Sequence, residues 1–181
     1  IESSGFRALT VFRSELYCIS GSSVHAVSPA DGSATFTDYE IASASDSVNR
    51  ISEASDTARA GDLLITADTG NSRVSIFNFS TDGYTVIDCA AAPTLVATDG
   101  EIIAYAAGAQ VYTCNYAAGE REFTAAELSG VDIAGLAVLY GETYYVKTNG
   151  TRGVVGGAST EMGSATPTGL TCDLYGNLYV S

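Results

Sequence analysis

The sequence predicts an all-β protein: a β-propeller of four-stranded antiparallel blades, with four complete blades and part of a fifth in this chain. The first observation behind this prediction is an internal repeat. Five similar segments recur roughly every forty residues, a period typical of propeller blades and of helical solenoids. They are "SELYCIS" from Ser14, "GDLLITA" from Gly61, "GEIIAYA" from Gly100, "GETYYVK" from Gly141 and "GNLYVS" from Gly176.

The residue types in the repeat favour a propeller over a solenoid. The apolar runs are rich in Val, Ile, Tyr, Thr and Phe, which are strand formers, and helical periodicity is weak. The runs "LLIT", "IIAY" and "TYYV" are apolar on both strand faces, as expected for inner strands that neighbouring blades cover on both sides. The segments "ATFTDYEI" and "REFTAAEL" are more polar and are predicted to be outer strands.

Short turn signals separate the strands within each repeat. Asp-Gly and Asn-Gly pairs favour the positive φ angles of hairpin turns, so each repeat is predicted to be a meander of four antiparallel strands. The clearest pairs are Asp31-Gly32, Asp82-Gly83, Asp99-Gly100 and Asn149-Gly150.

The repeat divides residues 1–181 into the blades of a single propeller domain or of a segment of one. The predicted blades cover about 6–47, 48–92, 93–132 and 133–166, with a partial blade at 167–181. Because the partial blade has two strands, Leu178–Val180 is expected to present an unpaired apolar edge. We therefore expect further polypeptide or a neighbouring subunit to supply the missing strands by β-augmentation.

Two stretches of the chain resemble the NHL repeat. The run "DTGNSRV", Asp68 to Val74, is similar to the core of that motif, and "PTGLTCDLYGNLYVS", Pro167 to Ser181, is similar to its first half. The other repeats keep only the skeleton of the pattern. The resemblance implies a β-propeller, which in that family commonly has six blades.

The Asp68 run is interpreted as a structural turn. Asp68 can accept hydrogen bonds from backbone amides two or three residues further on, which closes an Asx-type turn. Gly70 and Asn71 tolerate left-handed φ angles, and Arg73 can fork onto a nearby carboxylate or carbonyl. All of these roles stabilise a hairpin, so we favour a structural role over ligand binding.

The charge balance excludes several classes of partner. The chain carries a net charge of −13 and a single lysine, Lys147. An acidic surface repels phosphate backbones, so nucleic acids and anionic membranes are disfavoured partners. There is no run of eighteen apolar residues that would predict a membrane span. A basic protein or calcium is compatible with this surface, but no pair of carboxylates is singled out by spacing, so no metal or cofactor site is predicted.

The residues needed for the common catalytic sites are missing from the sequence. His25 is the only histidine, whereas zinc-dependent propeller lyases need several. No Gly-x-Ser-x-Gly elbow occurs, and the glycine-rich stretch Gly153 to Ser159 lacks the lysine of a P-loop. We therefore expect a protein that is not an enzyme.

Four cysteines and two sequons bear on the compartment. Cys18, Cys89, Cys114 and Cys172 lie far apart and are either two disulfides of unknown pairing or four small buried hydrophobes. Asparagine-linked glycans would attach at Asn78 and Asn149, in "NFS" and "NGT". Asn149 lies in a predicted hairpin turn, where a glycan would be accessible. Together these features favour a secreted glycoprotein at an extracellular or cell-surface location.

The leading functional hypothesis is a non-catalytic extracellular propeller module. It would serve protein–protein interaction or structural assembly, and could form a subunit of a glycosylated extracellular polymer through copies of itself or a protein partner at the open edge. The first alternative is a propeller that binds a carbohydrate or small ligand at the channel mouth or on a patch formed by Tyr140, Tyr144 and Tyr145. The second alternative is a fragment of a propeller enzyme whose active site lies outside this segment.

Overall fold

A computed structural model of the chain contains four four-stranded antiparallel sheets and one two-stranded sheet. It describes residues 8–12, 15–20, 23–28, 35–39, 51–81, 83–126, 128–163, 166–173 and 175–181. Before residue 51, the side chains described are those of Thr10 and Val11. In these residues the single helical element is a one-turn 3-10 helix, η1 (Thr69–Asn71). The predicted all-β class and the antiparallel blades are confirmed.

Each of the first two blades is a meander in which consecutive strands pair. Blade one contains β1 (Ala8–Phe12), β2 (Glu15–Ser20), β3 (Ser23–Ser28) and β4 (Thr35–Tyr39). Blade two contains β5 (Asp56–Ala60), β6 (Leu63–Asp68), β7 (Arg73–Asn78) and β8 (Gly83–Asp88).

The remaining sheets follow the same order. Blade three contains β9 (Leu95–Thr98), β10 (Ile102–Ala107), β11 (Gln110–Asn115) and β12 (Thr124–Ala125). Blade four contains β13 (Ile133–Leu139), β14 (Glu142–Lys147), β15 (Thr151–Val154) and β16 (Ser159–Glu161). Blade five contains β17 (Leu170–Cys172) and β18 (Leu178–Val180).

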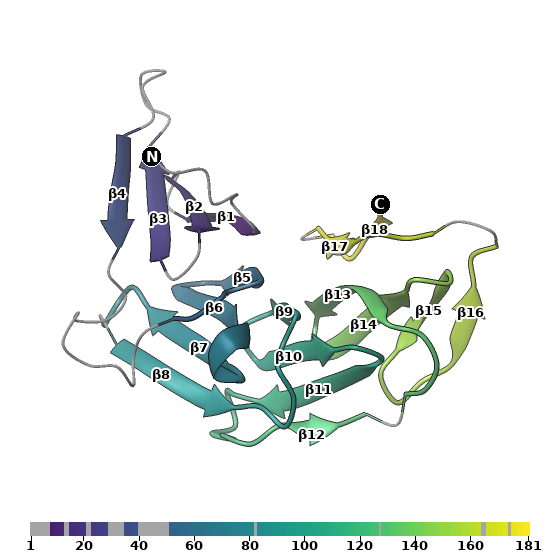
Figure 1. The fold of residues 1–181 in the computed structure, drawn as a ribbon. Coiled ribbons are helices and arrows are strands. Elements are labelled where there is room, and N and C mark those ends of the chain that lie inside the picture. Colours follow the sequence, from purple (N-terminus) through teal and green to yellow (C-terminus); the bar gives the residue numbers. More distant parts are fainter. Residues whose placement is uncertain are drawn as a thin grey trace.

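The blades are arranged around an open arc, with the first strand of each blade on its inner side (Figure 1). These inner strands contact one another in chain order, from β1 to β5, β9, β13 and β17. In Figure 1, β1 and β17 face each other across the opening of the arc. The turns between the first and second strands therefore gather at one end of the central channel.

The hydrophobic core lies between neighbouring blades, as β10 illustrates. Side chains alternate between the two faces of a strand, so each face of β10 meets a different blade. Ile103 and Tyr105 pack with the core of blade two, whereas Ala104 and Ala106 pack with that of blade four. All four side chains are fully buried. This two-sided burial is the physical reason for the continuous apolar run in the sequence.

Tyrosines contribute to this core through cross-strand pairs. Tyr105 lies opposite Tyr112 of β11, and their rings stack with centroids 4.5 Å apart. Phe123 approaches Tyr105 edge-on at 4.7 Å, a geometry that the ring quadrupoles favour. The Tyr105 hydroxyl also accepts a hydrogen bond from the backbone N–H of Ala90. Tyr105 therefore holds the segment after blade two against blade three.

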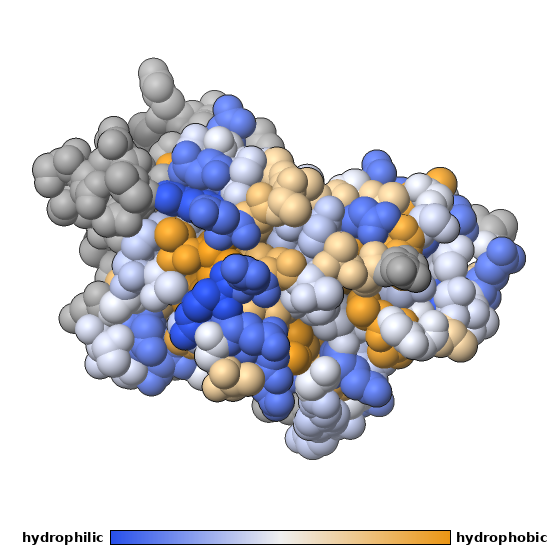
Figure 2. Space-filling model, turned by 90° about the horizontal axis from the view of Figure 1, so that it is seen from below, coloured by the Kyte–Doolittle hydropathy of each residue, from blue (hydrophilic) through white to orange (hydrophobic). Residues whose placement is uncertain are grey.

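The surface exposes apolar residues in patches separated by polar ones, as the face in Figure 2 shows.

Lys147, the single lysine of the chain, does not contribute to the surface. Its side chain is buried, and its ammonium group donates a hydrogen bond to the carbonyl of Ser129. The described surface therefore carries its positive charge on arginine alone.

Blades four and five approach each other most closely at Gly135, a buried residue of β13. A Cβ added there would lie 2.3 Å from the backbone nitrogen of Leu170 and 2.6 Å from the carbonyl carbon of Gly169. Real Cβ atoms do not come this close to backbone atoms. Gly135 therefore allows β17 to stack directly on β13.

Replacing Gly135 with alanine is expected to lower the free energy of unfolding by about 1–3 kcal/mol, the usual cost of forcing extra volume into a packed interior. Urea denaturation measures this change, and amide exchange should show faster opening of β17 and β18. Gly157→Ala is the matched control, because its new Cβ would lie 3.4 Å from Val154 Cβ, an ordinary contact. If Gly135→Ala and Gly157→Ala lowered the free energy of unfolding equally, close packing at Gly135 would not be the cause of the loss.

Candidate functional site

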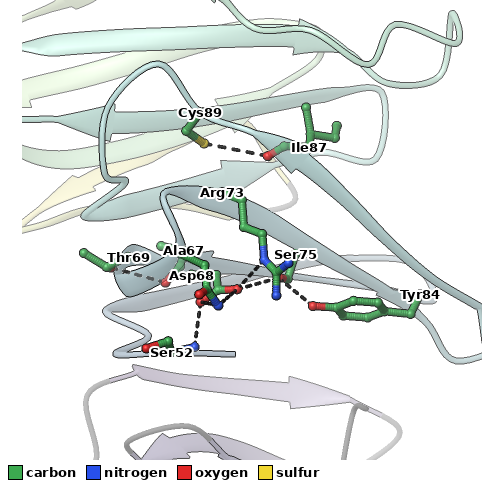
Figure 3. Close-up of polar contacts among 10 residues, drawn as sticks. Ser52, Ala67, Asp68, Thr69, Arg73, Ser75, Tyr84, Ile87 and Cys89 are labelled. Carbon is green, nitrogen blue, oxygen red and sulfur yellow. Dashed lines mark hydrogen bonds and ion pairs between the residues drawn. The ribbon is translucent and has the colours of Figure 1, made fainter. Parts of the chain in front are cut away.

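The Asp68 turn forms a buried polar cluster at the end of β6 (Figure 3). The Asp68 side chain is fully buried, and both carboxylate oxygens accept hydrogen bonds. Oδ1 accepts from the backbone N–H of Ser52 at 2.7 Å and from the Asn71 side chain at 3.0 Å. Oδ2 accepts from Arg73 Nε at 2.7 Å, Asn71 Nδ2 at 2.9 Å and Ser75 Oγ at 3.3 Å.

This cluster connects the turn to distant parts of the chain. The backbone N–H of Ser52 binds Asp68, and the carbonyl of Ser52 accepts the N–H of Gly70 at 2.8 Å. The Thr69 hydroxyl donates to the Pro93 carbonyl at 2.7 Å. One turn therefore fixes the segment that enters blade two and the segment that enters blade three. These contacts occupy Asp68 inside the protein, in line with a structural role.

The backbone of the turn differs from the sequence-based expectation. Gly70 and Asn71, predicted to be left-handed, belong to the 3-10 helix η1, and Ser72 is the left-handed residue with φ 52°. Gly70 is needed for space instead, because a Cβ there would lie 2.6 Å from Ser52 Oγ. Asp68 binds the distant Ser52 amide and makes no side-chain cap to η1, so the predicted Asx-type closure is wrong.

Two further aspartates connect neighbouring blades. Asp56, the first residue of β5, accepts the N–H of Val96 in β9 at 2.9 Å. Asp99, in the β9–β10 turn, accepts the N–H of Gly141 in the β13–β14 turn at 2.7 Å. In each case a carboxylate of one blade binds a backbone donor of the next, which fixes how the two blades stack.

Asp56 lies beside the central channel, where the inner strands of all five blades border a pocket of about 330 Å³. Burial raises the pKa of the Asp56 carboxyl to about 6, and the N–H groups of Val96 and Thr57 oppose this rise. Its charged form is therefore disfavoured in the folded protein at mildly acidic pH.

A larger pocket of about 710 Å³ lies where the turns between first and second strands converge. We call it the mouth pocket. Residues of blades two, three, four and five line it, among them Arg59, Asp99, Glu101, Tyr140 and Asp173. Sequence reasoning could not find this set, because its members lie in four different repeats.

The predicted tyrosine patch does not form. Tyr140 is 74% exposed and lines the mouth pocket. Tyr144 and Tyr145 line a different pocket. Tyr144 donates a hydrogen bond to Glu142, whereas Tyr145 is buried in the core between blades three and four, because successive residues of a strand point to opposite faces.

Three of the four cysteines are described, and all three are free thiols: Cys89, Cys114 and Cys172. Two disulfides among four cysteines would need at least one bridge within this set, so that predicted arrangement is absent. Cys114 is buried in the core, and burial raises the pKa of Cys89 to about 12. Cys114 agrees with the alternative of a small buried hydrophobe, and Cys89 and Cys172 are partly buried. The Cys18 side chain lies outside the described residues.

The two sequon asparagines lie at turns. Asn149 is exposed between β14 and β15, and its side-chain oxygen accepts the N–H of Thr151. Asn78 ends β7 and is partly buried, and its side-chain oxygen accepts the hydroxyl of Ser80 at 2.7 Å. Glycosylation at either site stays a prediction.

Two searches for further sites concern the described residues alone. Among them, no three His, Cys, Asp or Glu side chains gather as metal ligands would. None of their helices is long and apolar enough to span a membrane. His25 belongs to β3, and its side chain is outside the described part.

Comparison with known proteins shows the fold. No protein-family model matches the sequence, and no curated protein sequence matches it. Among solved structures, a chain of a nidogen/laminin complex superposes with a TM-score of 0.70 at 15% identity, covering 100% of this chain and 73% of that one. The computationally designed protein Ika4 superposes with a TM-score of 0.65 at 11% identity, covering 85% and 92% of the two chains.

Hydrazine synthase from Kuenenia stuttgartiensis also matches, with a TM-score of 0.60 at 14% identity. The alignment covers 85% of this chain and 46% of that one, so this chain spans about half the length of that neighbour. With identities this low, the likeness concerns the fold. It agrees with a β-propeller built of similar blades.

Asp68→Ala is expected to lower the free energy of unfolding by about 3–5 kcal/mol, because it removes a carboxylate that is bonded to the buried Arg73 guanidinium. Urea denaturation measures the loss. The double variant Asp68→Ala/Arg73→Ala should lose clearly less than the sum of the two single variants, since the contact between the two side chains can be lost only once. If the two losses in the free energy of unfolding were additive, the contact between Asp68 and Arg73 would contribute nothing to stability.

Asp56→Asn is expected to change how stability depends on pH. Because the pKa of Asp56 is about 6 in the folded protein and that of an ordinary aspartate is 3.8, the proton stabilises the fold below about pH 4. This contribution is lost as the pH rises through 6. From pH 4 to pH 7.5 the unaltered protein should lose about 1–3 kcal/mol relative to the variant. If the free energy of unfolding changed with pH equally in the unaltered protein and in Asp56→Asn, the prediction would be wrong.

Proposed function

We propose that this chain is a non-catalytic protein-interaction module that assembles through the open edge of blade five. The observation that carries the proposal is the outward-facing backbone of β18 beside a largely apolar groove. The likeness to a chain of a nidogen/laminin complex supports it at the level of fold. We also infer a propeller of NHL type, supported by the motif from Asp68 to Val74.

The backbone direction at β18 defines the open edge. The N–H of Ser181 binds the carbonyl of Gly169, so the backbone groups of this residue face β17. Because backbone groups alternate along an antiparallel strand, those of Leu178 and Val180 face away from β17. Such a row of outward donors and acceptors is a template for another strand.

A groove lies beside this edge and fits the face of an added strand. It has a volume of about 210 Å³ and runs between the outer part of blade four and the fifth blade. Its lining is largely apolar, with Val154, Leu170, Leu178 and Val180 among the contributing residues, and Arg152 also takes part.

A second copy of this chain is the occupant that we propose. Two β18 strands paired antiparallel about a two-fold axis would form the sheet β17-β18-β18′-β17′, which has four strands like every complete blade. A two-fold contact closes on itself, so a longer polymer would require a second contact elsewhere. We infer an extracellular location from the two sequons and the acidic, lysine-poor composition.

The carbohydrate-binding alternative is favoured by one observation, the exposed Tyr140 ring in the mouth pocket. An aromatic ring beside carboxylates can stack on a sugar and bind its hydroxyl groups. The enzyme-fragment alternative has no such support among the described residues.

Size-exclusion chromatography with light scattering on the 181-residue chain tests the proposal. We expect a concentration-dependent dimer or larger assembly, and Val180→Pro should abolish it by removing an outward-facing N–H. Val180→Pro should keep the β17–β18 pairing, which amide exchange reports. Val131→Asn, a control at an exposed apolar residue between blades three and four, should assemble normally. A monomer at every concentration, or an assembly that Val180→Pro leaves intact, would refute the proposal.

A further inference from the structure

The mouth pocket combines an apolar wall with a carboxylate rim. The wall includes Val138, Leu139 and the ring of Tyr140, all from one end of blade four. The rim carries Asp99 and Glu101 of blade three and Asp173 of blade five. The pocket volume of about 710 Å³ is large enough for a long side chain and its flanking backbone.

The Tyr140 turn lies between blades three and five. Tyr140 has a φ of 53°, which is strained for a residue with a side chain. Asp99 of blade three binds the N–H of Gly141, the next residue in the same turn. On the other side, a Cβ added at Gly176 of blade five would lie 3.6 Å from the Tyr140 ring. The backbone of the turn is therefore bonded to blade three, and the exposed ring lies beside the β17–β18 turn.

Hydrogen bonds keep Asp99 and Asp173 charged at neutral pH. Burial alone would raise the pKa of Asp99, but the N–H groups of Ile102, Gly141 and Glu101 outweigh it, and the pKa lies below its usual value. Hydrogen bonds from the Asn177 side chain and backbone lower the pKa of Asp173 to about 2. Glu101 is exposed.

Arg59, the one arginine among the described lining residues, offsets only part of the charge of the three carboxylates. Arg59 donates from Nη1 to the carbonyl of Val11 in blade one, and from Nε to the carbonyl of Gly61. These bonds hold its guanidinium toward the backbone of blades one and two. The rim thus presents anionic groups around an aromatic ring, a combination that attracts a cation to the ring face.

We propose that the mouth pocket binds an arginine or lysine side chain on an exposed loop of a partner protein. The aliphatic stem of that side chain would lie along the apolar wall, its cationic head would meet the Tyr140 ring, and the rim carboxylates would accept its hydrogen bonds. This site is separate from the β18 edge, so it goes beyond the assembly proposed above.

Amide-shift titration by NMR tests this proposal, with the peptide acetyl-Gly-Arg-Gly-amide as the probe and acetyl-Gly-Gln-Gly-amide as its neutral control. The arginine peptide should produce saturable shifts at the amides of Gly61, Glu101 and Gly141, and the glutamine peptide should produce none. Val180→Pro should bind the peptide normally, so the result does not depend on assembly.

Three variants separate the site from general attraction to an acidic protein. Glu101→Gln should weaken peptide binding about two- to fivefold, the range of an exposed ion pair. Tyr140→Asn, which tolerates the left-handed backbone, should weaken it about two- to tenfold. Glu161→Gln, which removes an exposed charge on β16, should leave binding unchanged.

Two outcomes would overturn the proposal. Equal weakening by Glu101→Gln and Glu161→Gln would show unspecific attraction to the protein's net charge. Saturable shifts with methyl glucoside at the same amides, unaffected by Glu101→Gln and larger than those with the arginine peptide, would assign the pocket to a carbohydrate.

Discussion

Face-to-face stacking of neighbouring blades is the constraint on which the rest of this structure depends. A blade in the middle of the arc buries both faces, so its inner strands must be apolar on both sides, as Ile103 and Ala104 of β10 are. The same requirement places Gly135 where β13 meets blade five, since no Cβ fits there. The apolar groove beside β18 lies where blade four meets blade five.

Carboxylates supply the polar part of this stacking. Asp68, Asp56 and Asp99 each accept a backbone N–H from another segment, so part of the acidic composition has a structural use. Their surroundings have opposite electrostatic effects. Burial raises the pKa of Asp56, whereas several backbone donors hold the pKa of Asp99 below its usual value. One residue type therefore serves both as a pH-sensitive contact and as a fixed charge.

The two candidate surfaces differ in what they recognise. The edge of β18 offers backbone groups, which any extended strand can pair with, so affinity there depends on the face that packs into the groove. The mouth pocket offers an aromatic ring and fixed charges, which select the chemistry of a single side chain. Both surfaces arise from the blade repeat, one at an end of the stack and the other at the mouth of the channel.

The sequence by itself determined the blade type and the strand order within a blade, because these depend on residues close together in the chain. It also predicted a carboxylate or carbonyl partner for Arg73, which is Asp68 in the structure. It failed where distant segments meet. Ser52 approaches from outside the turn, so Gly70 serves close packing and Ser72 takes the left-handed angle. The mouth pocket and the separation of Tyr140 from Tyr145 were likewise decided by tertiary structure alone. The physical reason is that side chains from four repeats converge only after the blades have stacked.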